Sequence, residues 1–330
     1  MRNPLPGSPG GPWPEIAVDV EAIRAAHARI APHVRRTPVM SCAPLDAAAG
    51  AQLHFKCENF QDVGAFKARG AANAIFSLAP AEAARGVVTH SSGNHGAALA
   101  WAAARRGISA WIVMPDNAPA VKQANVRGFG GQVRLCAPTV AAREAACAAV
   151  QTETGATLVH PYNDWRVIAG QGTAALELLE EIPDLDAVVA PVGGGGLLSG
   201  TAIAARSLRA TLRVFGAEPK GADDAQRSLA AGHIIAQDNP RTIADGLRTS
   251  LGDKTFAVLS CLVEGIGVAS EEAIVAAMRL TWEKMKIVIE TSSAVPLACL
   301  MERSLDLAGL KVGVILSGGN VDLERLPWQQ

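Results

Sequence analysis

Short apolar runs alternate with longer alanine-rich stretches along most of this chain. The apolar runs are typical of buried strands, whereas the alanine-rich stretches are long enough to form helices. Strands are expected at 52–56, 86–89, 110–113, 132–135, 187–191, 213–217 and 311–316, and helices at 68–78, 96–106, 140–154, 172–181 and 270–285. This alternation is typical of parallel sheets with helices on both faces, so the sequence predicts an α/β fold.

Glycine-bearing turns follow several of these apolar runs. They lie at 91–96, 193–196, 244–246 and 317–320, and all except 244–246 directly follow an expected strand. Ligands of open parallel sheets bind at the carboxyl ends of the strands. A binding site is therefore expected where these turns gather.

Composition and charge exclude several classes of partner. The chain has 330 residues, of which 49% are hydrophobic, so it can bury a sizeable core in one or two domains. Lysine plus arginine is 30 against 31 acidic residues, and only 4% of the residues are aromatic, so no surface for nucleic acid or for an acidic membrane is expected. The most apolar stretch, 97–114, contains Arg105 and Arg106 and is too short and too charged to span a bilayer.

The cysteines and the N-terminus favour a cytoplasmic protein. No CxxC pair is present, so the cysteines predict neither a zinc site nor a disulfide framework, and we expect reduced thiols. They are Cys42, Cys57, Cys136, Cys147, Cys261 and Cys299. Residues 1–15 are rich in proline and glycine and lack the apolar segment of a signal peptide, which predicts a loose arm. The chain ends at Gln330, soon after its last motif, so no appended regulatory domain is expected.

One lysine lies in a run of small residues beside an aromatic ring. The run is Gly64-Ala65-Phe66-Lys67-Ala68-Arg69-Gly70. A lysine that binds a carbonyl compound must be held by its neighbours, and its amine must be able to lose a proton. Lys67 is therefore a candidate for holding an aldehyde cofactor, with Phe66 packed on the edge of that cofactor. The alternative is an exposed lysine at the start of a helix.

Four consecutive glycines, at 193–196, follow an apolar strand and open a helix. Backbone N–H groups at such a position lack partners, the helix dipole favours an anion, and glycine lets the backbone approach a phosphate closely. The run predicts a phosphate site, and its alternative is a flexible turn. A dinucleotide fingerprint is disfavoured because the run lies deep in the chain and lacks the G-x-G-x-x-G spacing.

Three further polar clusters each have an ordinary structural alternative. Ser91-Ser92-Gly93-Asn94-His95 offers donors for a carboxylate, or it supplies an N-cap. Ser317-Gly318-Gly319-Asn320 follows an apolar strand, or it is a plain turn. Residues 218–224 bring Glu218 and Asp224 together with a glycine, which suits a hard cation or a solvated acidic turn.

In their order along the chain, these motifs resemble those of the fold-type II pyridoxal phosphate enzymes, in the branch of the serine/threonine dehydratases and serine racemase. The resemblance runs from about Ile23 to Trp328. It rests on Phe55-Lys56-Cys57-Glu58, Ala65-Phe66-Lys67-Ala68-Arg69-Gly70-Ala71, Ser91-Ser92-Gly93-Asn94-His95, Ala169-Gly170-Gln171-Gly172-Thr173, Gly193-Gly194-Gly195-Gly196, Ala244-Asp245-Gly246 and Ser317-Gly318-Gly319-Asn320. We expect two lobes, each with a mainly parallel sheet: a large lobe at 1–84 and 164–330, and a small lobe at 85–163. A homodimer is expected because relatives are commonly dimers.

The resemblance implies a role for each matching position. Around pyridoxal 5'-phosphate, Lys67 would hold the aldehyde, Phe66 would pack near the ring, Asn94 would bind the ring hydroxyl, Ser317 would face the pyridine nitrogen, and Gly193, Gly194, Gly195 and Gly196 would hold the phosphate. Ser91, Asn94 and His95 would bind the substrate carboxylate, and Ser92 would also contact the substrate. Glu218, the carbonyl of Ala222 and Asp224 would bind Mg²⁺ or a similar divalent cation.

The implied reaction is α,β-elimination from a β-hydroxy-α-amino acid, which gives a 2-oxo acid and ammonia. Lys67 would remove the α-proton. A serine at the pyridine nitrogen leaves that nitrogen less positively charged than an aspartate would, which favours elimination over transamination. The substrate would be serine, threonine or 3-hydroxyaspartate. Arg143 could pair with the second carboxylate of hydroxyaspartate, or it is an exposed helix arginine.

Several positions depart from the common pattern of the family. Ala65 stands where a serine often precedes the Phe-Lys pair, and Ser92 carries a hydroxyl, as in serine racemase, where that residue serves as a second base. Serine racemisation is therefore an alternative activity, and a non-catalytic binding protein is another. Tyr162 stands where racemases tend to have asparagine. The segments 160–164, 292–298 and 320–328 are more similar to bacterial hydroxyaspartate dehydratases.

Overall fold

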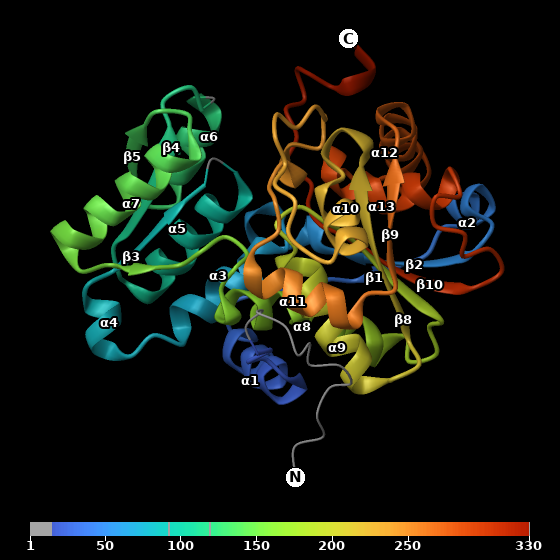
Figure 1. Ribbon diagram of the computed structural model, residues 1–330, viewed down its shortest axis with the longest axis horizontal. Coiled ribbons are helices and arrows are strands. Elements are labelled where there is room, and N and C mark those ends of the chain that lie inside the picture. The colour runs from blue at the N-terminus through green and yellow to red at the C-terminus, as the bar shows by residue number, and fades with distance from the viewer. Residues whose placement is uncertain (1–14, 92, 119, 330) are drawn as a thin grey trace.

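The computed structural model of the chain describes residues 15–91, 93–118 and 120–329. The loose arm expected at 1–15 lies outside these residues, apart from Glu15. The described chain forms two lobes, each built around its own sheet (Figure 1). Within the described ranges, no helix is both long and apolar enough to cross a membrane.

The larger sheet has six strands in the order β1-β2-β10-β7-β8-β9. Only β1 runs antiparallel to its neighbour, and the other neighbouring pairs are parallel. The strands are β1 (Val39–Met40), β2 (Gln52–Cys57), β7 (Ala187–Pro191), β8 (Arg213–Pro219), β9 (Gly265–Ala269) and β10 (Lys311–Leu316). The smaller sheet is entirely parallel, in the order β5-β4-β3-β6. Its strands are β3 (Val87–His90), β4 (Ala110–Pro115), β5 (Gln132–Cys136) and β6 (Thr157–Leu158).

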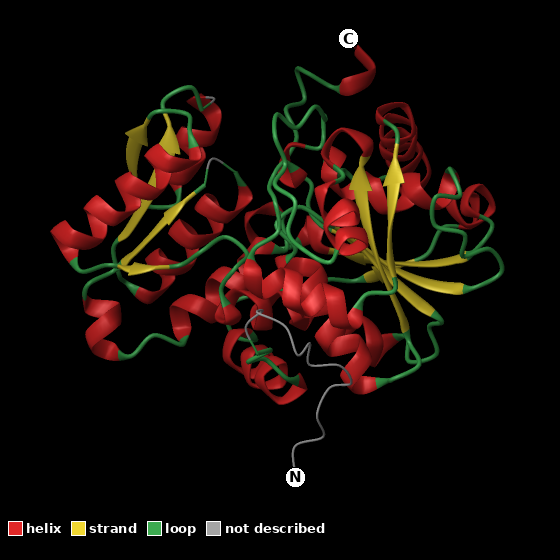
Figure 2. Cartoon of the chain, in the orientation of Figure 1, coloured by secondary structure: helices red, strands yellow, loops and turns green. Residues whose placement is uncertain are grey.

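Helices cover both faces of the sheets (Figure 2). They are α1 (Val20–Ile30), α2 (Ala43–Ala49), α3 (Lys67–Phe76), α4 (Pro80–Ala84), α5 (Asn94–Arg106), α6 (Ala120–Gly128), α7 (Val140–Thr154), α8 (Trp165–Glu181), α9 (Gly196–Leu208), α10 (Asp224–Ala231), α11 (Asp253–Leu262), α12 (Glu271–Met285) and α13 (Thr291–Met301). The predicted α/β fold with two mainly parallel sheets is confirmed. The lobe boundaries at 84/85 and 163/164 stay a prediction.

Strand β10 shows why the larger sheet needs cover on both faces. Val312 and Val314 belong to the core cluster that contains α12 and α13, whereas Ile315 belongs to the cluster that contains α8 and α9. Successive side chains of a strand point to opposite faces, so an apolar run of this kind is buried from both sides.

The structure differs from the expected elements in two ways, and the first has a clear physical cause. Helix α8 begins at Trp165, seven residues before the expected start at 172, because the Asp164 side chain accepts a hydrogen bond from the Arg166 N–H and caps the helix. Gly170 and Gly172 then lie inside the helix. A Cβ on Gly172 would lie 2.8 Å from a carbonyl oxygen of α9, so this glycine permits close packing of the two helices. Strand β9 and helix α13, which were not expected, complete the larger lobe.

Candidate active site

The predicted lysine is the first residue of α3 and lies beside the carboxyl end of β10. Ala65 forms an antiparallel bridge with Gly318, and the Phe66 N–H donates to the Ser317 carbonyl at 2.9 Å. These two contacts bring Lys67 to the residues that follow β10. The lysine therefore lies at the edge of the sheet where parallel sheets bind their ligands.

The amine of Lys67 is held by a backbone carbonyl and lies close to an aromatic ring. Its Nζ donates to the Pro161 carbonyl at 2.8 Å and lies 5.0 Å from the centroid of the Phe66 ring. Burial lowers the pKa of the Lys67 amine to about 8, while the carboxylate of Glu290 acts in the opposite direction. A lysine with such a pKa has a substantial neutral fraction near neutral pH, and the neutral amine is a nucleophile and a base.

The tetraglycine run joins β7 to α9 and is buried along its whole length. Across the part of the chain that the structure describes, the backbone N–H groups of Gly193, Gly194 and Gly195 have no protein acceptor. Gly195 has a φ of 84°, a conformation that favours glycine. Buried N–H groups without partners at a helix N-terminus form an anion site, so this loop fits a phosphate group.

Tyr162 packs directly on the tetraglycine loop. A Cβ on Gly194 would lie 2.3 Å from the Tyr162 ring, and a Cβ on Gly196 would lie 2.9 Å from the Tyr162 Cβ. No larger side chain fits at either position while the tyrosine keeps its place. The His160 ring contacts the Tyr162 ring edge-on, with centroids 4.6 Å apart. Burial raises the pKa of Tyr162 to about 12, so its hydroxyl stays protonated near neutral pH.

Asn94, the first residue of α5, is held by two residues of the larger lobe. Its Nδ2 donates to both carboxylate oxygens of Glu290, at 3.2 and 3.1 Å. Its Oδ1 accepts a hydrogen bond from the Asn320 Nδ2 at 2.9 Å, and the Asn320 N–H donates to Glu290 at 3.2 Å. The two bonds to Glu290 use both N–H groups of the amide, and Oδ1 keeps one lone pair, which could accept the predicted hydrogen bond from a ring hydroxyl. Sequence analysis missed Glu290, whose side chain gave no local signal.

Glu290 should give the protein a measurable pH dependence. Burial, assisted by the Asp245 carboxylate and opposed by the Asn94 amide, raises the pKa of the Glu290 carboxyl from 4.5 to about 7. The charged groups that act on it are Asp245, Lys122 and Lys67. Because the folded-state pKa is the higher one, this contribution to stability is complete below pH 4.5 and is lost as the pH rises through about 7.

We therefore expect Glu290→Gln to weaken the dependence of unfolding free energy on pH. Without cofactor, the wild-type protein should lose about 3 kcal/mol more than the variant between pH 4.5 and pH 7.5. Urea unfolding of both proteins across this range measures the difference. Parallel curves would show that Glu290 ionises at its ordinary pKa.

The remaining predicted substrate residues lie between β3 and the first turn of α5. The Ser91 Oγ accepts a hydrogen bond from the Gly93 N–H at 3.3 Å. The His95 Nε2 lies 3.3 Å from the Val159 carbonyl, and its buried Nδ1 has no partner among the described residues. Burial lowers the pKa of His95 well below its usual value, so the ring is neutral. Ser92 lies outside the described residues.

Arg143 lies on α7 and forms no ion pair among the described residues, although the neighbouring Glu144 carboxylate acts on the pKa values of His90 and Tyr162 in the opposite direction. Its Nε donates to the Thr139 carbonyl at 3.3 Å, and no carboxylate of the described residues lies within 4.0 Å of its guanidinium. Its charge lowers the pKa of His90 and opposes the rise in the pKa of Tyr162. The charge of the guanidinium is therefore felt at Tyr162, which packs on the tetraglycine loop. It is available to bind a carboxylate.

The predicted cation ligands gather at the end of β8. Glu218 accepts hydrogen bonds from the N–H groups of Ala225 and Gln226, at 3.0 and 2.8 Å. Both carboxylate oxygens of Asp224 are buried and have no partner among the described residues. Burial raises the pKa of both acids, that of Asp224 to about 6. No cluster of three or more cysteine, histidine or acidic side chains occurs there or elsewhere in the described chain, so a cation would need a backbone carbonyl such as that of Ala222.

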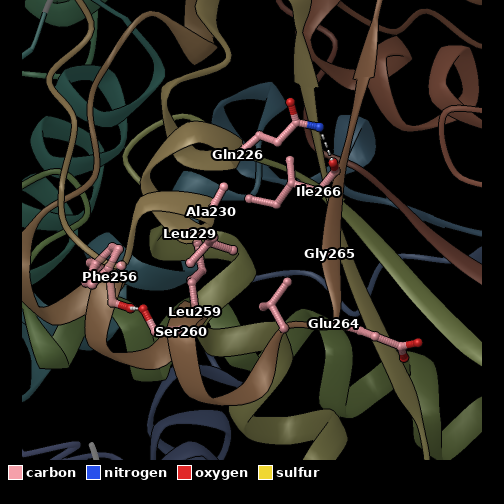
Figure 3. Close-up of a pocket in the computed structure, with 11 residues that line it drawn as sticks. Gln226, Leu229, Ala230, Phe256, Leu259, Ser260, Glu264, Gly265 and Ile266 are labelled. Carbon is pink, nitrogen blue, oxygen red and sulfur yellow. Dashed lines mark hydrogen bonds between the residues drawn. The ribbon is translucent and has the colours of Figure 1, made fainter.

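A separate pocket of about 580 Å³ lies beside β9, between α10 and α11 (Figure 3). The Gln226 Nε2 donates to the Ile266 carbonyl at 2.9 Å on one side, and Phe256 and Leu259 line the other. None of the predicted site residues lines this pocket. The predicted chemistry is therefore not located there.

Comparison with known proteins shows which family model, relatives and solved structures this chain resembles. The family model described as pyridoxal-phosphate dependent enzyme matches residues 30–318. The beta-hydroxyaspartate dehydratase of Paracoccus denitrificans is 54% identical over 308 residues, which are 93% of this chain and 98% of that protein. A serine racemase of Oryza sativa is 50% identical over 325 residues and 96% of each chain. The structure of maize serine racemase matches with a TM-score of 0.92 and 50% identity, over 95% of this chain and 96% of that one.

Proposed function

Because the chain belongs to the family of pyridoxal-phosphate dependent enzymes, we propose that it is a dehydratase that converts a β-hydroxy-α-amino acid into a 2-oxo acid and ammonia. The observation that carries this proposal is the position of the Lys67 amine, whose pKa is lowered by burial. It lies at the same edge of the sheet as the tetraglycine loop, whose backbone N–H groups have no protein acceptor among the described residues. A lysine with a lowered pKa both holds a carbonyl compound and accepts a proton.

The cofactor fits the residues present. The buried N–H groups of the tetraglycine loop would hold its phosphate, Asn94 would bind its ring hydroxyl, and Ser317 would face its pyridine nitrogen. When bound, the cofactor supplies an electron-withdrawing ring that accepts the electron pair left when the α-proton of the substrate departs.

The Nζ of Lys67 would accept the α-proton of the substrate. The Pro161 carbonyl orients this amine, and burial lowers its pKa to about 8, so that it loses its proton more readily than an exposed lysine and can then accept the α-proton. Loss of the α-proton and of the β-hydroxyl removes one water from the substrate. The unsaturated amine that remains rearranges and is hydrolysed to the 2-oxo acid and ammonia.

The substrate carboxylate would lie against the N-terminus of α5. Ser91, Asn94 and His95 come together there, and the unpaired N–H groups of the first helical turn favour an anion. Since the His95 side chain is neutral and its Nε2–H is used by Val159, this histidine would contribute its backbone N–H. Ser92 would also contact the substrate.

We propose 3-hydroxyaspartate as the preferred substrate. The unpaired guanidinium of Arg143 would bind its second carboxylate, and the relative from Paracoccus denitrificans is named for that substrate. The test is ammonia release by the cofactor-loaded protein, with 3-hydroxyaspartate compared with L-threonine at equal concentration. A preference for threonine would make the protein a general serine/threonine dehydratase. No ammonia from either substrate would reject the dehydratase.

Replacing Arg143 with methionine should lower kcat/KM for 3-hydroxyaspartate by about 10- to 100-fold, because a charged hydrogen bond contributes roughly 1.5–3 kcal/mol. The value for L-threonine should change little, since threonine has no second carboxylate. Arg134→Met is the matched control, because Arg134 lies on the same lobe and is already paired with Glu153 at 3.4 Å. Equal losses with both substrates would show that Arg143 has only a structural role.

Serine racemisation is the second candidate function, and the identity with a serine racemase favours it. In this reading, Ser92 would act as a base on the second face of the substrate. Chiral analysis of the serine that remains after incubation separates the two reactions. A Ser92→Ala variant that still eliminates but no longer racemises would assign both activities to one site.

We also propose a divalent cation, with Mg²⁺ as the expected ion, bound by Glu218, the Ala222 carbonyl and Asp224. Mg²⁺ at roughly 100 times its dissociation constant should stabilise the protein by about 3 kcal/mol, because it offsets the unpaired charge of Asp224. Asp224→Asn should abolish this gain, whereas Asp223→Asn should keep it, since Asp223 is paired with Arg227. Thermal unfolding with Mg²⁺ and with a chelator measures the gain. Equal gains in both variants would reject the site.

A cytoplasmic homodimer completes the proposal. Reduced cysteines support the location, because none of the six is in a disulfide. Light scattering coupled to gel filtration tests the dimer, and fractionation of the producing cells tests the location.

A further inference from the structure

One ion pair crosses from the smaller lobe to the larger lobe. The Lys122 Nζ of α6 donates to the Asp245 Oδ2 at 2.6 Å. Helix α6 packs on α5 and β5 of the smaller lobe, whereas Asp245 begins a short turn, Asp245–Leu247, that packs on α13 of the larger lobe (Figure 1). Within the described part of the chain, no other ion pair joins the two lobes. The proposed function makes no use of this pair, although Asp245 lies in a motif that the sequence singled out.

The turn that carries Asp245 is fixed against the phosphate loop. A Cβ on Gly193, the first residue of the tetraglycine run, would lie 3.0 Å from the Gly246 carbonyl oxygen and 3.0 Å from the Leu247 Cα. The Gly246 N–H donates to the Ser292 Oγ at 3.1 Å, and Leu247 is buried. Lys122 therefore bonds to a part of the larger lobe that packs directly on the predicted phosphate site.

The ion pair is coupled to the other polar contact between the lobes. Asn94, the first residue of α5, donates to the Glu290 carboxylate of the larger lobe. Besides burial, which has the largest effect, Asp245 raises the pKa of Glu290 and Lys122 lowers it. Both charges of the ion pair are thus felt by the carboxyl group that holds Asn94. Because α5 and α6 pack together, the two contacts hold the same part of the smaller lobe.

The exposure of the pair sets the size of its effect. The side chains of Lys122 and Asp245 are 37% and 48% exposed, so water and salt screen their attraction. A pair of this kind adds little to the stability of the whole fold. The opening of one lobe away from another is governed by a much smaller free-energy difference than unfolding, so even a weak contact changes the populations of the open and closed forms.

We propose that Lys122 and Asp245 form an interlobe ion pair that holds the smaller lobe closed over the site, and that salt weakens this pair and so opens the site to solvent. The inference rests on the proposed function, which takes site residues from both lobes. Lys122 is a positioning residue, because it acts through the position of its lobe and has no contact with a predicted site residue. Closure would exclude water while the cofactor and substrate are bound.

The rate at which hydroxylamine removes the cofactor from the holoenzyme tests the proposal. This small uncharged reagent converts the bound aldehyde into an oxime once it enters the site, and the change in visible absorbance gives the rate. At low salt, Lys122→Met should react about two- to five-fold faster than the wild type. Raising NaCl from about 0.05 M to about 0.5 M should accelerate the wild type by a similar factor and leave Lys122→Met unchanged.

Reversing both charges separates an ion pair from a merely structural contact. Lys122→Asp combined with Asp245→Lys restores opposite charges and should return the slow rate together with its dependence on salt. Lys122→Asp alone should react at least as fast as Lys122→Met, because two carboxylates would then face each other. Arg134→Met is the matched control, since the exposed pair of Arg134 with Glu153 lies wholly within the smaller lobe. A wild-type rate in Lys122→Met, or no slowing in the double variant, would overturn the proposal.

These readouts are separate from the test of the proposed function. Hydroxylamine needs bound cofactor but no turnover, so a protein that releases no ammonia could fail as a dehydratase and still show the interlobe ion pair. In the cofactor-free protein, trace acetylation of Lys67 by acetic anhydride, measured by mass spectrometry, reports access to the same site. Lys67 should be acetylated about two- to five-fold faster in Lys122→Met than in the wild type, with the exposed Lys284 as the internal reference. An unchanged rate at Lys67 would contradict the proposal whether or not the protein takes up the cofactor.

Discussion

Replacing Lys67 with alanine should lower ammonia release on the order of 10³-fold. Two functions are lost together, because the same amine holds the cofactor aldehyde and accepts the α-proton of the substrate. The phosphate should still bind, since the N–H groups of the tetraglycine loop do not depend on the lysine. The variant should therefore bind the cofactor noncovalently and turn over very slowly.

Two measurements check this prediction. Steady-state ammonia release gives the loss of activity, and mass spectrometry after borohydride reduction shows whether the cofactor is attached to the chain. Lys284→Ala is the matched control, because Lys284 is exposed on α12 and should leave both readouts unchanged. Full activity in Lys67→Ala would remove the lysine from the mechanism. No activity in the wild type would favour the non-catalytic binding protein.

Replacing Glu177 with glutamine should destabilise the fold by about 3–5 kcal/mol. Glu177 is 2% exposed and lies against two buried cations. Its oxygens accept from the Arg69 Nη1 and Nη2, at 2.7 and 2.8 Å, and one of them lies 2.7 Å from the Lys56 Nζ. In the wild type, the two positive charges of Arg69 and Lys56 are balanced by the two negative charges of Glu177 and Glu58. The variant would leave one positive charge in excess in the interior.

The same network fixes the start of α3. The Arg69 Nε and Nη2 also donate to the two oxygens of Glu58, at 2.8 Å each, so a single guanidinium joins α3 to α8 and to the turn after β2. Arg69 lies two residues after Lys67. Loss of the network should therefore loosen the segment that carries the cofactor lysine, as well as lower the stability of the fold.

Glu180→Gln is the matched control for Glu177→Gln. Both glutamates lie on α8 and both pair with an arginine, but Glu180 and its partner Arg36 are about half exposed, at 47% and 51%. Exposed pairs contribute roughly 0–1 kcal/mol, so the control should unfold almost as the wild type does. Urea unfolding of the three proteins gives the comparison. Similar losses in both variants would contradict the role assigned to burial.

The sequence by itself determined the fold class and the parts of the site that are local in the chain. Strand and helix periodicity requires only neighbouring residues, so the parallel α/β architecture could be predicted without tertiary information. The tetraglycine run was also readable, because a buried turn at φ 84° before a helix suits glycine whatever surrounds it. Lys67 stood out because small residues and one aromatic ring flank it.

Only the tertiary structure decided which groups act on those parts. Glu290 lies 196 residues from Asn94, Lys122 lies 123 residues from Asp245, and Glu177 lies 108 residues from Arg69. Each of these side chains would suit an exposed helix or an N-cap in the sequence alone. Hydrogen-bond direction and proton affinity depend on burial and on partners a few ångströms away, and the fold brings those partners together from distant segments. The sequence shows which side chain is present at a position. Its protonation state and the direction of its hydrogen bonds depend on the neighbours that surround it in the folded protein.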